Sequence, residues 1–368
     1  MIPFANPSAS YQAHKPEIDA AISRVLGSGI YVLGKEVSFF EEEFASHYGN
    51  NFHAIGVANG TDAIVLSLHA LGLGKGDEVI TTSHTAVATI AGIEQANCTP
   101  VLADIDPLSR CICPKSIAQL ITEKTKAVMP VHIYGQPCAM NDIFKIAQKH
   151  KLKLIEDCSQ AHGAEVQGRK VGSFGDIATF SCYPTKNLGG IGDAGVILCS
   201  SKRIESHLRS IREYGWNNLR ESIVSGFNSR LDEIQASILR VKLKYLSEDL
   251  EKRKRIANLY YKNLAGFPLK LPLRNENEIH AMHLFVIECD NRDGLLNHLR
   301  REGIGASLHY PLAIHQQKAY SNRFRGSNNL EITEDFYKRH LTLPLFPELS
   351  KTDIEKIIAS ISSWFNQD

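Results

Sequence analysis

The sequence has no excess of charge of either sign and no long apolar run. Its 368 residues include 41 Lys and Arg and 40 Asp and Glu, which gives a formal net charge of +1. No basic cluster interleaved with aromatic residues is present, so we expect no nucleic acid partner. No stretch reaches the roughly 20 apolar residues of a membrane-spanning helix, and residues 1–7 lack the pattern of a secretory signal. We therefore predict a cytoplasmic protein that binds a small molecule and does not contact a membrane.

Paired cysteine motifs are also missing. The eight cysteines are scattered without Cys-x-x-Cys spacing, at positions 98, 111, 113, 138, 158, 182, 199 and 289. Several lie in apolar stretches, and free cysteine is among the most frequently buried residues, so we interpret them as small core residues. The closest pair, Cys111 and Cys113, lacks further ligands at the spacing of a zinc site. The sequence therefore predicts no metal site.

Short apolar stretches alternate with amphipathic ones over residues 53–213, and the sequence contains no internal repeat. The expected strands are 53–58, 78–82, 100–104, 127–131, 153–157, 176–180 and 193–199, and the expected helices are 61–71, 86–97, 114–123, 140–150 and 201–213. This alternation predicts an α/β fold in which helices cover both faces of a mostly parallel sheet. Ligands of such folds bind at the carboxyl ends of the strands.

Other helical patterns flank this region. A helix that begins at Pro16 and stops at Gly27 and Gly29, and a second helix at 36–48, form an entry arm. Residues 226–236 open a long helix that ends near Leu264. A helix of that length usually bridges two domains. We therefore expect a large domain at residues 1–245 and a small α+β domain at residues 246–368. The small domain is expected to contain a strand at 283–288 and helices at 292–302 and 352–364.

One lysine follows a predicted buried strand directly. Residues 176–180 are apolar, and residues 181–190 are rich in Pro, Asn and Gly and contain Lys186. A strand that ends in such a loop is a common place for functional side chains on an α/β scaffold. Lys186 is therefore a candidate for a lysine that forms a Schiff base. The alternative is an ordinary solvated loop lysine, because most lysines are exposed.

A carboxylate follows another predicted strand. Residues 153–157 form an apolar strand that ends in Glu156 and Asp157. Pyridoxal phosphate needs an anion beside its ring nitrogen and a lysine for its aldehyde. Asp157 and Lys186 are the two groups that this chain would supply. The alternative for Asp157 is the cap of a following helix.

A Gly-Thr turn at Gly60 and Thr61 opens a predicted helix. Free amides at a helix N-terminus, with a hydroxyl beside them, form an anion site that suits a phosphate. The alternative is a helix cap without a ligand.

Taken in order, the motifs resemble the DegT/DnrJ/EryC1/StrS family of sugar aminotransferases along nearly the whole chain. The motifs that carry the resemblance are 60–61, 156–163, 181–186, 226–236, and 309–311 with His315. The resemblance implies a pyridoxal-phosphate enzyme with the aspartate-aminotransferase fold (fold type I). It also implies a homodimer.

The resemblance implies a role for each matched residue. Lys186 would bind the cofactor covalently and then transfer a proton between the substrate and the cofactor, while Asp157 would pair with the ring nitrogen and Gln160 would lie near the ring hydroxyl. The residues expected at the phosphate are Gly60, Thr61 and Ser181. Asn228 would reach the phosphate of the other subunit, so that each active site is composite.

Three residues resemble the family's substrate-side residues: Tyr183, His309 and Tyr310. The alternative for each of them is simple packing. The sequence also departs from the family at Ala86, where many relatives have an aromatic residue that stacks on the cofactor ring. We expect His84 to take over this stacking.

The predicted reaction is transfer of an amino group from glutamate to a nucleotide-linked keto-sugar, in amino-sugar biosynthesis for a surface polysaccharide such as lipopolysaccharide or for a secondary metabolite. Segments 84–89, 212–216 and 228–233 are similar to relatives that aminate carbon 3 of a dTDP-linked 6-deoxyhexose, so we expect carbon 3. The alternatives are amination at carbon 4 of a dTDP- or UDP-linked sugar, a related sugar dehydratase, and a cofactor-free scaffold. The dehydratases have His in place of the lysine, and Lys186 is present.

Overall fold

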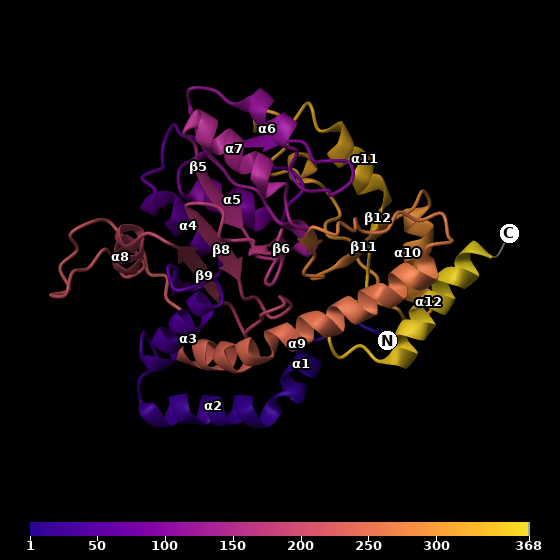
Figure 1. Ribbon diagram of the computed structural model, residues 1–368, viewed down its shortest axis with the longest axis horizontal. Helices are drawn as coiled ribbons and strands as arrows, with labels where there is room; N and C mark the ends of the chain where they lie inside the picture. The colour runs from indigo at the N-terminus through magenta and orange to yellow at the C-terminus, as the bar shows by residue number, and fades with distance from the viewer. Residues whose placement is uncertain (367–368) are drawn as a thin grey trace.

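The computed structural model describes residues 1–366 and is built on a seven-stranded sheet (Figure 1). The strands lie in the order β1-β9-β8-β5-β4-β2-β3. Their bounds are His53–Val57 (β1), Glu78–Thr82 (β2), Thr99–Ala103 (β3), Thr125–Val128 (β4), Lys153–Asp157 (β5), Ile177–Ser181 (β8) and Gly195–Cys199 (β9). Strand β9 is antiparallel to β1 and β8, and the other neighbouring strands are parallel. The expected α/β fold with a mostly parallel sheet is confirmed.

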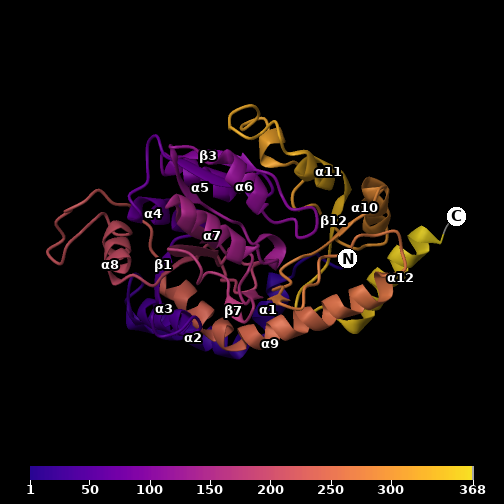
Figure 2. The same ribbon diagram turned by 45° about the horizontal axis from the view of Figure 1, so that its top comes forward.

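Helices cover both faces of this sheet (Figure 2). They are α4 (Gly60–Ala70), α5 (Val87–Gln95), α6 (Pro114–Leu120), α7 (Met140–His150) and α8 (Lys202–Ile211). Successive residues of a strand point to opposite faces, so Leu154 packs into the core on the α6 and α7 side while Ile155 packs against α4 and α5. Burial on both faces explains why the sequence of each strand is almost continuously apolar.

The longest helix, α9 (Glu233–Leu264), runs along the molecule from the sheet to the C-terminal part (Figure 1). Its first half packs into the core of the sheet through Leu239 and Leu243, and its second half packs into a separate cluster through Ile256 and Tyr260. That cluster includes side chains of β11 (Phe285–Glu288), α10 (Arg292–Arg301), β12 (His340–Leu343) and α12 (Lys351–Phe365). The long helix therefore links two cores, as expected.

Several elements were missing from the sequence prediction. They are α1 (Pro7–Ala13), which precedes the expected arm helices α2 (Lys15–Ser28) and α3 (Lys35–Ser46), the short strands β6 (Glu165–Val166), β7 (Arg169–Lys170) and β10 (Glu278–Ile279), the strand β12, and α11 (Glu331–Arg339). Within segment 313–337, Ile314, Phe324 and Leu330 pack against Ile90 and Leu102 of the sheet domain. Part of the chain beyond residue 246 thus returns to the large domain, and the division at residue 245 stays a prediction.

In residues 1–366, no helix is long and apolar enough to span a membrane. All eight cysteines are free, seven of them are buried, and Cys113 is partly exposed. The interpretation of the cysteines as small core residues is therefore confirmed for those seven.

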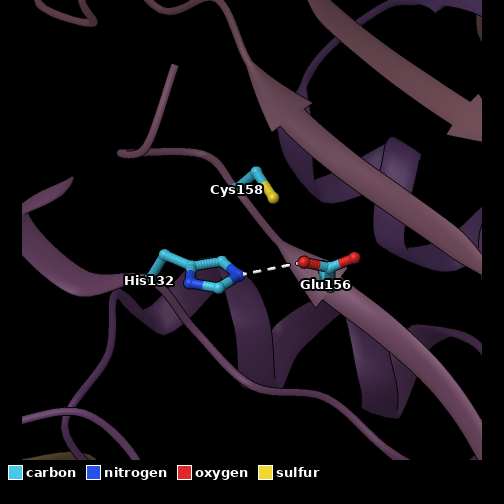
Figure 3. Close-up of side chains that lie close together, drawn as sticks. All are labelled: His132, Glu156 and Cys158. Atoms are coloured by element: carbon cyan, nitrogen blue, oxygen red, sulfur yellow. Dashed lines mark hydrogen bonds and ion pairs between the residues drawn. The ribbon is translucent and has the colours of Figure 1, made fainter. Parts of the chain in front are cut away.

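One buried polar cluster lies at the end of β5, where His132, Glu156 and Cys158 come together (Figure 3). The Glu156 carboxylate accepts hydrogen bonds from the backbone amides of Gly172 (2.7 Å), Phe174 (2.7 Å) and Gly175 (2.8 Å).

Both other members of the cluster are neutral partners. His132 Nδ1 accepts from the amide of Cys138 at 3.0 Å, so His132 Nε2 carries the proton and donates it to Glu156 at 3.3 Å. Burial raises the pKa of the Cys158 thiol well above its ordinary value, which keeps the thiol protonated. Glu156 therefore anchors the loop at residues 172–175, and these contacts explain the cluster without an ion.

Replacing this carboxylate should destabilise the fold. Glu156→Gln keeps the size of the side chain but turns one acceptor oxygen into an NH2 group that faces backbone N–H donors. We expect a loss of about 2–4 kcal/mol in the free energy of unfolding, measured by chemical denaturation. The matched control is Glu165→Gln on β6, a half-buried position, where we expect a change below about 0.5 kcal/mol. Equal stability of the two variants would contradict this role of Glu156.

Candidate active site

The carboxyl ends of β1, β5 and β8 meet at a cavity of about 550 Å³. Parallel strands bring their carboxyl ends to one edge of the sheet, so segments far apart in the chain converge there. The predicted site residues that line the cavity are Gly60, Thr61, Asp157, Gln160, Ser181, Tyr183 and Lys186. This volume is typical of a site for a small organic cofactor or substrate.

Lys186 lies in a tight loop after β8. Its amide donates to the carbonyl of Tyr183 at 2.8 Å, and the amide of Gly190 donates to the carbonyl of Cys182 at 2.8 Å. A Cβ atom at Gly189 would lie 2.6 Å from the carbonyl oxygen of Pro184, so the loop closes this tightly only with glycine there. Burial lowers the pKa of Lys186 to about 8, and the nearby Asp157 carboxylate partly opposes this effect. The lysine is therefore a partly neutral amine near pH 8, not a solvated loop cation.

Asp157 is 3% exposed and is held at both carboxylate oxygens. Oδ1 accepts from the amide of Ser159 at 3.1 Å, and Oδ2 accepts from the Thr89 hydroxyl at 2.9 Å. The chain after Asp157 forms turns, and the next regular element is β6, so the alternative of a helix cap is wrong. The structure thus presents a fixed anion to the cavity.

The N-terminus of α4 forms another wall. Asn59 caps the helix by accepting from the amide of Asp62 at 2.8 Å, and the first intrahelical bond runs from Ala63 to Asn59 at 3.1 Å. The amides of Gly60 and Thr61 precede that bond and face no carbonyl of the helix. A Cβ atom at Gly60 would lie 2.8 Å from the Cβ atom of Ser181, so glycine lets the helix start directly against the end of β8. These amides lie next to the end of β8 and the Ser181 hydroxyl, and free amides at a helix N-terminus are suited to an anion.

Gln160 connects the cavity to the C-terminal part of the chain. Its Oε1 accepts from the amide of Tyr134 at 2.6 Å, and its Nε2 donates to the Tyr310 hydroxyl at 3.2 Å. Burial raises the pKa of Tyr310 to about 12, so its hydroxyl stays neutral. Burial lowers the pKa of His309 to about 4, with a smaller contribution from Lys186, and His309 Nδ1 lies 2.9 Å from the Thr342 hydroxyl. Neither residue is among the cavity-lining residues, and of the two Tyr310 contacts Gln160.

His84 lies elsewhere than expected. Its ring is fully buried, its Nδ1 lies 3.1 Å from the Tyr337 hydroxyl, and it packs edge-on against Tyr134 and Phe336. The residues of this loop that line the cavity are Thr85 and Ala86. The structure therefore does not support the prediction that His84 stacks on a cofactor ring. Its side chain lies instead in an aromatic cluster with Tyr134, Phe336 and Tyr337.

Asn228 is exposed, pairs with Glu213 in an isolated bridge, and does not line the cavity of its own chain. Tyr183 is 52% exposed at the mouth of the cavity. Sequence reasoning missed several hydroxyl residues of the cavity wall, and two of them are Thr85 and Thr89. Their spacing of four residues at the start of a helix is the one local signal that they share a face.

Comparisons with known proteins identify the family of this chain. The profile of the DegT/DnrJ/EryC1/StrS aminotransferase family matches residues 12–362. The dTDP-3-amino-3,6-dideoxy-alpha-D-galactopyranose transaminase of Aneurinibacillus thermoaerophilus is 42% identical over 99% of both chains. The dTDP-3-amino-3,4,6-trideoxy-alpha-D-glucose transaminase of Streptomyces venezuelae is 38% identical over 99% of this chain and 96% of that protein.

Solved structures of related proteins have the same fold. S. venezuelae DesV, in complex with a ketimine intermediate, superposes with a TM-score of 0.97 and 37% identity, covering 100% of this chain and 99% of that one. Bacillus subtilis ntda, with bound cofactor PMP, has a TM-score of 0.90 and 31% identity over 96% of this chain and 82% of that one. The chain belongs to the DegT/DnrJ/EryC1/StrS aminotransferase family.

Proposed function

We propose that this protein is a pyridoxal-phosphate-dependent aminotransferase that aminates carbon 3 of a dTDP-linked 3-keto-6-deoxyhexose, with glutamate as the amino donor. The observation that carries the proposal is the position of Lys186 and Asp157 on one cavity, beside the free amides at the start of α4. An amine, an anion and a phosphate site are the three groups that this cofactor requires. When bound, the cofactor supplies an electron sink for the substrate carbon.

Each of these cavity residues would have a separate role toward the cofactor. Lys186 would hold the aldehyde carbon and, once released from it, move a proton, a role for which a pKa of about 8 suits an amine near neutral pH. Asp157 would keep the ring nitrogen protonated. The groups that would bind the phosphate are the amides of Gly60 and Thr61 and the hydroxyl of Ser181. Gln160 lines the cavity and would face the ring hydroxyl of the cofactor, while its amide donates a hydrogen bond to the Tyr310 hydroxyl.

Carbon 3 is favoured by the named activities of the relatives. Two dTDP-sugar transaminases form 3-amino sugars, and a UDP-N-acetyl-3-dehydro-alpha-D-glucosamine 3-aminotransferase from Acidithiobacillus ferrooxidans is 38% identical over 98% of this chain. The shared feature of the three is the position that is aminated, whereas the nucleotide differs. A dehydratase is disfavoured because Lys186 is present at the loop after β8. The product would enter amino-sugar biosynthesis.

We further propose a homodimer with composite active sites. Asn228 is exposed and lies away from the cavity of its own chain, as a residue that serves a partner must. The exposed apolar residues Ile30, Tyr31 and Val32 form a loop that pairs with Asp232 at the start of α9. A second copy of the chain would cover this loop and bring its Asn228 to the neighbouring phosphate. Tyr183, which lines the cavity, would contact the sugar nucleotide from within one chain. His309 and Tyr310 do not line the cavity, and Tyr310 would instead support Gln160 through their hydrogen bond.

The first prediction concerns Lys186 and pH. Adding pyridoxal phosphate to cofactor-free protein should produce a visible absorption band, because the neutral amine of Lys186 attacks the aldehyde. The lowered pKa makes the neutral form available above about pH 8, so the initial rate should rise about tenfold per pH unit below pH 8 and level off above it. Lys186→Ala is the control and should show no band beyond that of free pyridoxal phosphate. A rate that keeps rising to pH 10, or a band that persists in Lys186→Ala, would contradict the assignment.

The second prediction concerns the substrate. With glutamate as donor, the enzyme should aminate a dTDP-linked 3-keto-6-deoxyhexose faster than the matching 4-keto sugar or the UDP-linked forms. Formation of 2-oxoglutarate measures the rate for each sugar. Preference for a 4-keto sugar would exclude carbon 3 amination while leaving the cofactor assignment intact.

The third prediction concerns the composite site. Lys186→Ala and Asn228→Ala proteins should each be nearly inactive. After subunit exchange, each mixed dimer has one site with both lesions and one intact site. An equal mixture should therefore recover about a quarter of wild-type activity. Confirmed exchange without recovery would mean that Asn228 serves its own chain.

A further inference from the structure

The strongest unassigned feature of the site is a chain of two hydroxyls that ends at Asp157. The Thr89 hydroxyl lies 2.9 Å from Asp157 Oδ2, and the Thr85 hydroxyl lies 2.6 Å from that of Thr89. All three side chains are buried. Asp157 ends β5, Thr89 lies in the first turn of α5, and Thr85 lies two residues before the first residue of α5. Thr89 and Asp157 are 68 residues apart in the chain.

The chemistry of the groups fixes the direction of this chain. An ionised carboxylate only accepts hydrogen bonds, and a hydroxyl has a single hydrogen to donate. Thr89 therefore donates to Asp157, which leaves Thr89 as an acceptor, so the hydrogen between the two hydroxyls comes from Thr85. The hydrogen bond from Thr85 to Thr89 strengthens the one from Thr89 to Asp157, because linked hydrogen bonds between buried groups polarise one another.

These hydroxyls are not explained by packing or by helix formation. A threonine within a helix commonly returns its hydroxyl to the carbonyl four residues earlier, whereas Thr89 directs its hydroxyl to the carboxylate and receives one from Thr85. A valine would fill the same volume and would bury no hydroxyl. The hydroxyl of Thr89 therefore has a role that depends on Asp157.

We propose that Thr89, supported by Thr85, is a positioning residue that holds the Asp157 carboxylate in the orientation that pairs with the cofactor's ring nitrogen. Oδ1 is held by the amide of Ser159 and Oδ2 by Thr89, so the plane of the carboxylate is fixed on both sides. Without Thr89, one oxygen loses its fixed donor and the group can rotate away from the ring. This inference rests on the proposed function and adds two residues to it.

The test measures the contact with the ring nitrogen directly. The probes are pyridoxamine 5′-phosphate, which needs no bond to Lys186, and its 1-deaza analogue, in which carbon replaces the ring nitrogen. Dissociation constants of both are measured for wild type, Thr89→Val and Thr89→Ser. The matched control is Thr81→Val, because Thr81 is also fully buried but donates its hydroxyl to the carbonyl of Met129 at 2.9 Å, away from Asp157. Asp157→Asn provides the reference for a damaged ring contact.

We expect Thr89→Val to bind pyridoxamine phosphate about tenfold more weakly than wild type, because a hydrogen bond to a charged group is lost. Its affinity for the deaza analogue should be unchanged. Thr89→Ser keeps the hydroxyl and should restore binding, and Thr81→Val should match wild type. Thr85→Val should show a smaller loss in the same direction.

Two results would overturn the proposal. One is equal binding of pyridoxamine phosphate by wild type and Thr89→Val. The other is an equal loss with the deaza analogue, which would show a general distortion of the cavity. Wild-type protein that binds neither probe would instead defeat the proposed function, and the positioning role with it, so the two failures are distinguishable.

Discussion

The parallel pairing of β5 with β8 is the constraint on which the site depends. Asp157 ends β5 opposite Thr179 of β8, and β8 ends two residues later and leads into the loop of Lys186. Parallel strands end at the same edge, so this register places a carboxylate and an amine beside one cavity. Neither charge is fully solvated there, and burial lowers the pKa of the amine to about 8 while fixed donors hold the carboxylate. The positions of the two groups therefore follow from the strand order, and the lowered pKa of Lys186 follows from its burial.

Glu156 and Asp157 are neighbours on β5 and face opposite sides of the sheet, because a strand alternates its side chains between the two faces. Glu156 points into the core, where backbone amides of the loop at 172–175 and His132 surround it. Asp157 points to the cavity. A shift of one residue in the register of β5 would exchange these positions and would leave the loop without its anchor. The same strand therefore stabilises the fold and presents the anion of the site.

The C-terminal part of the chain completes the site from outside the sheet. Tyr310 reaches it through Gln160, and the segment that follows packs through Ile314 and Phe324 against the sheet domain. Tyr310 and the segment that contains Ile314 and Phe324 are therefore both held against the sheet domain. This arrangement explains why a chain with a separate C-terminal core still places residues of that region beside the cavity.

Local patterns determined much of the molecule. The apolar strands, the Gly-Thr turn at Gly60, the strand that ends in Asp157 and the loop that carries Lys186 are all visible in the sequence, because strand periodicity and turn chemistry involve neighbouring residues. The tertiary structure alone decided that His84 turns into an aromatic cluster and that Thr89 meets Asp157. Both outcomes depend on which strands and helices lie next to each other. That order is set by packing between segments distant in the chain, which no local pattern records.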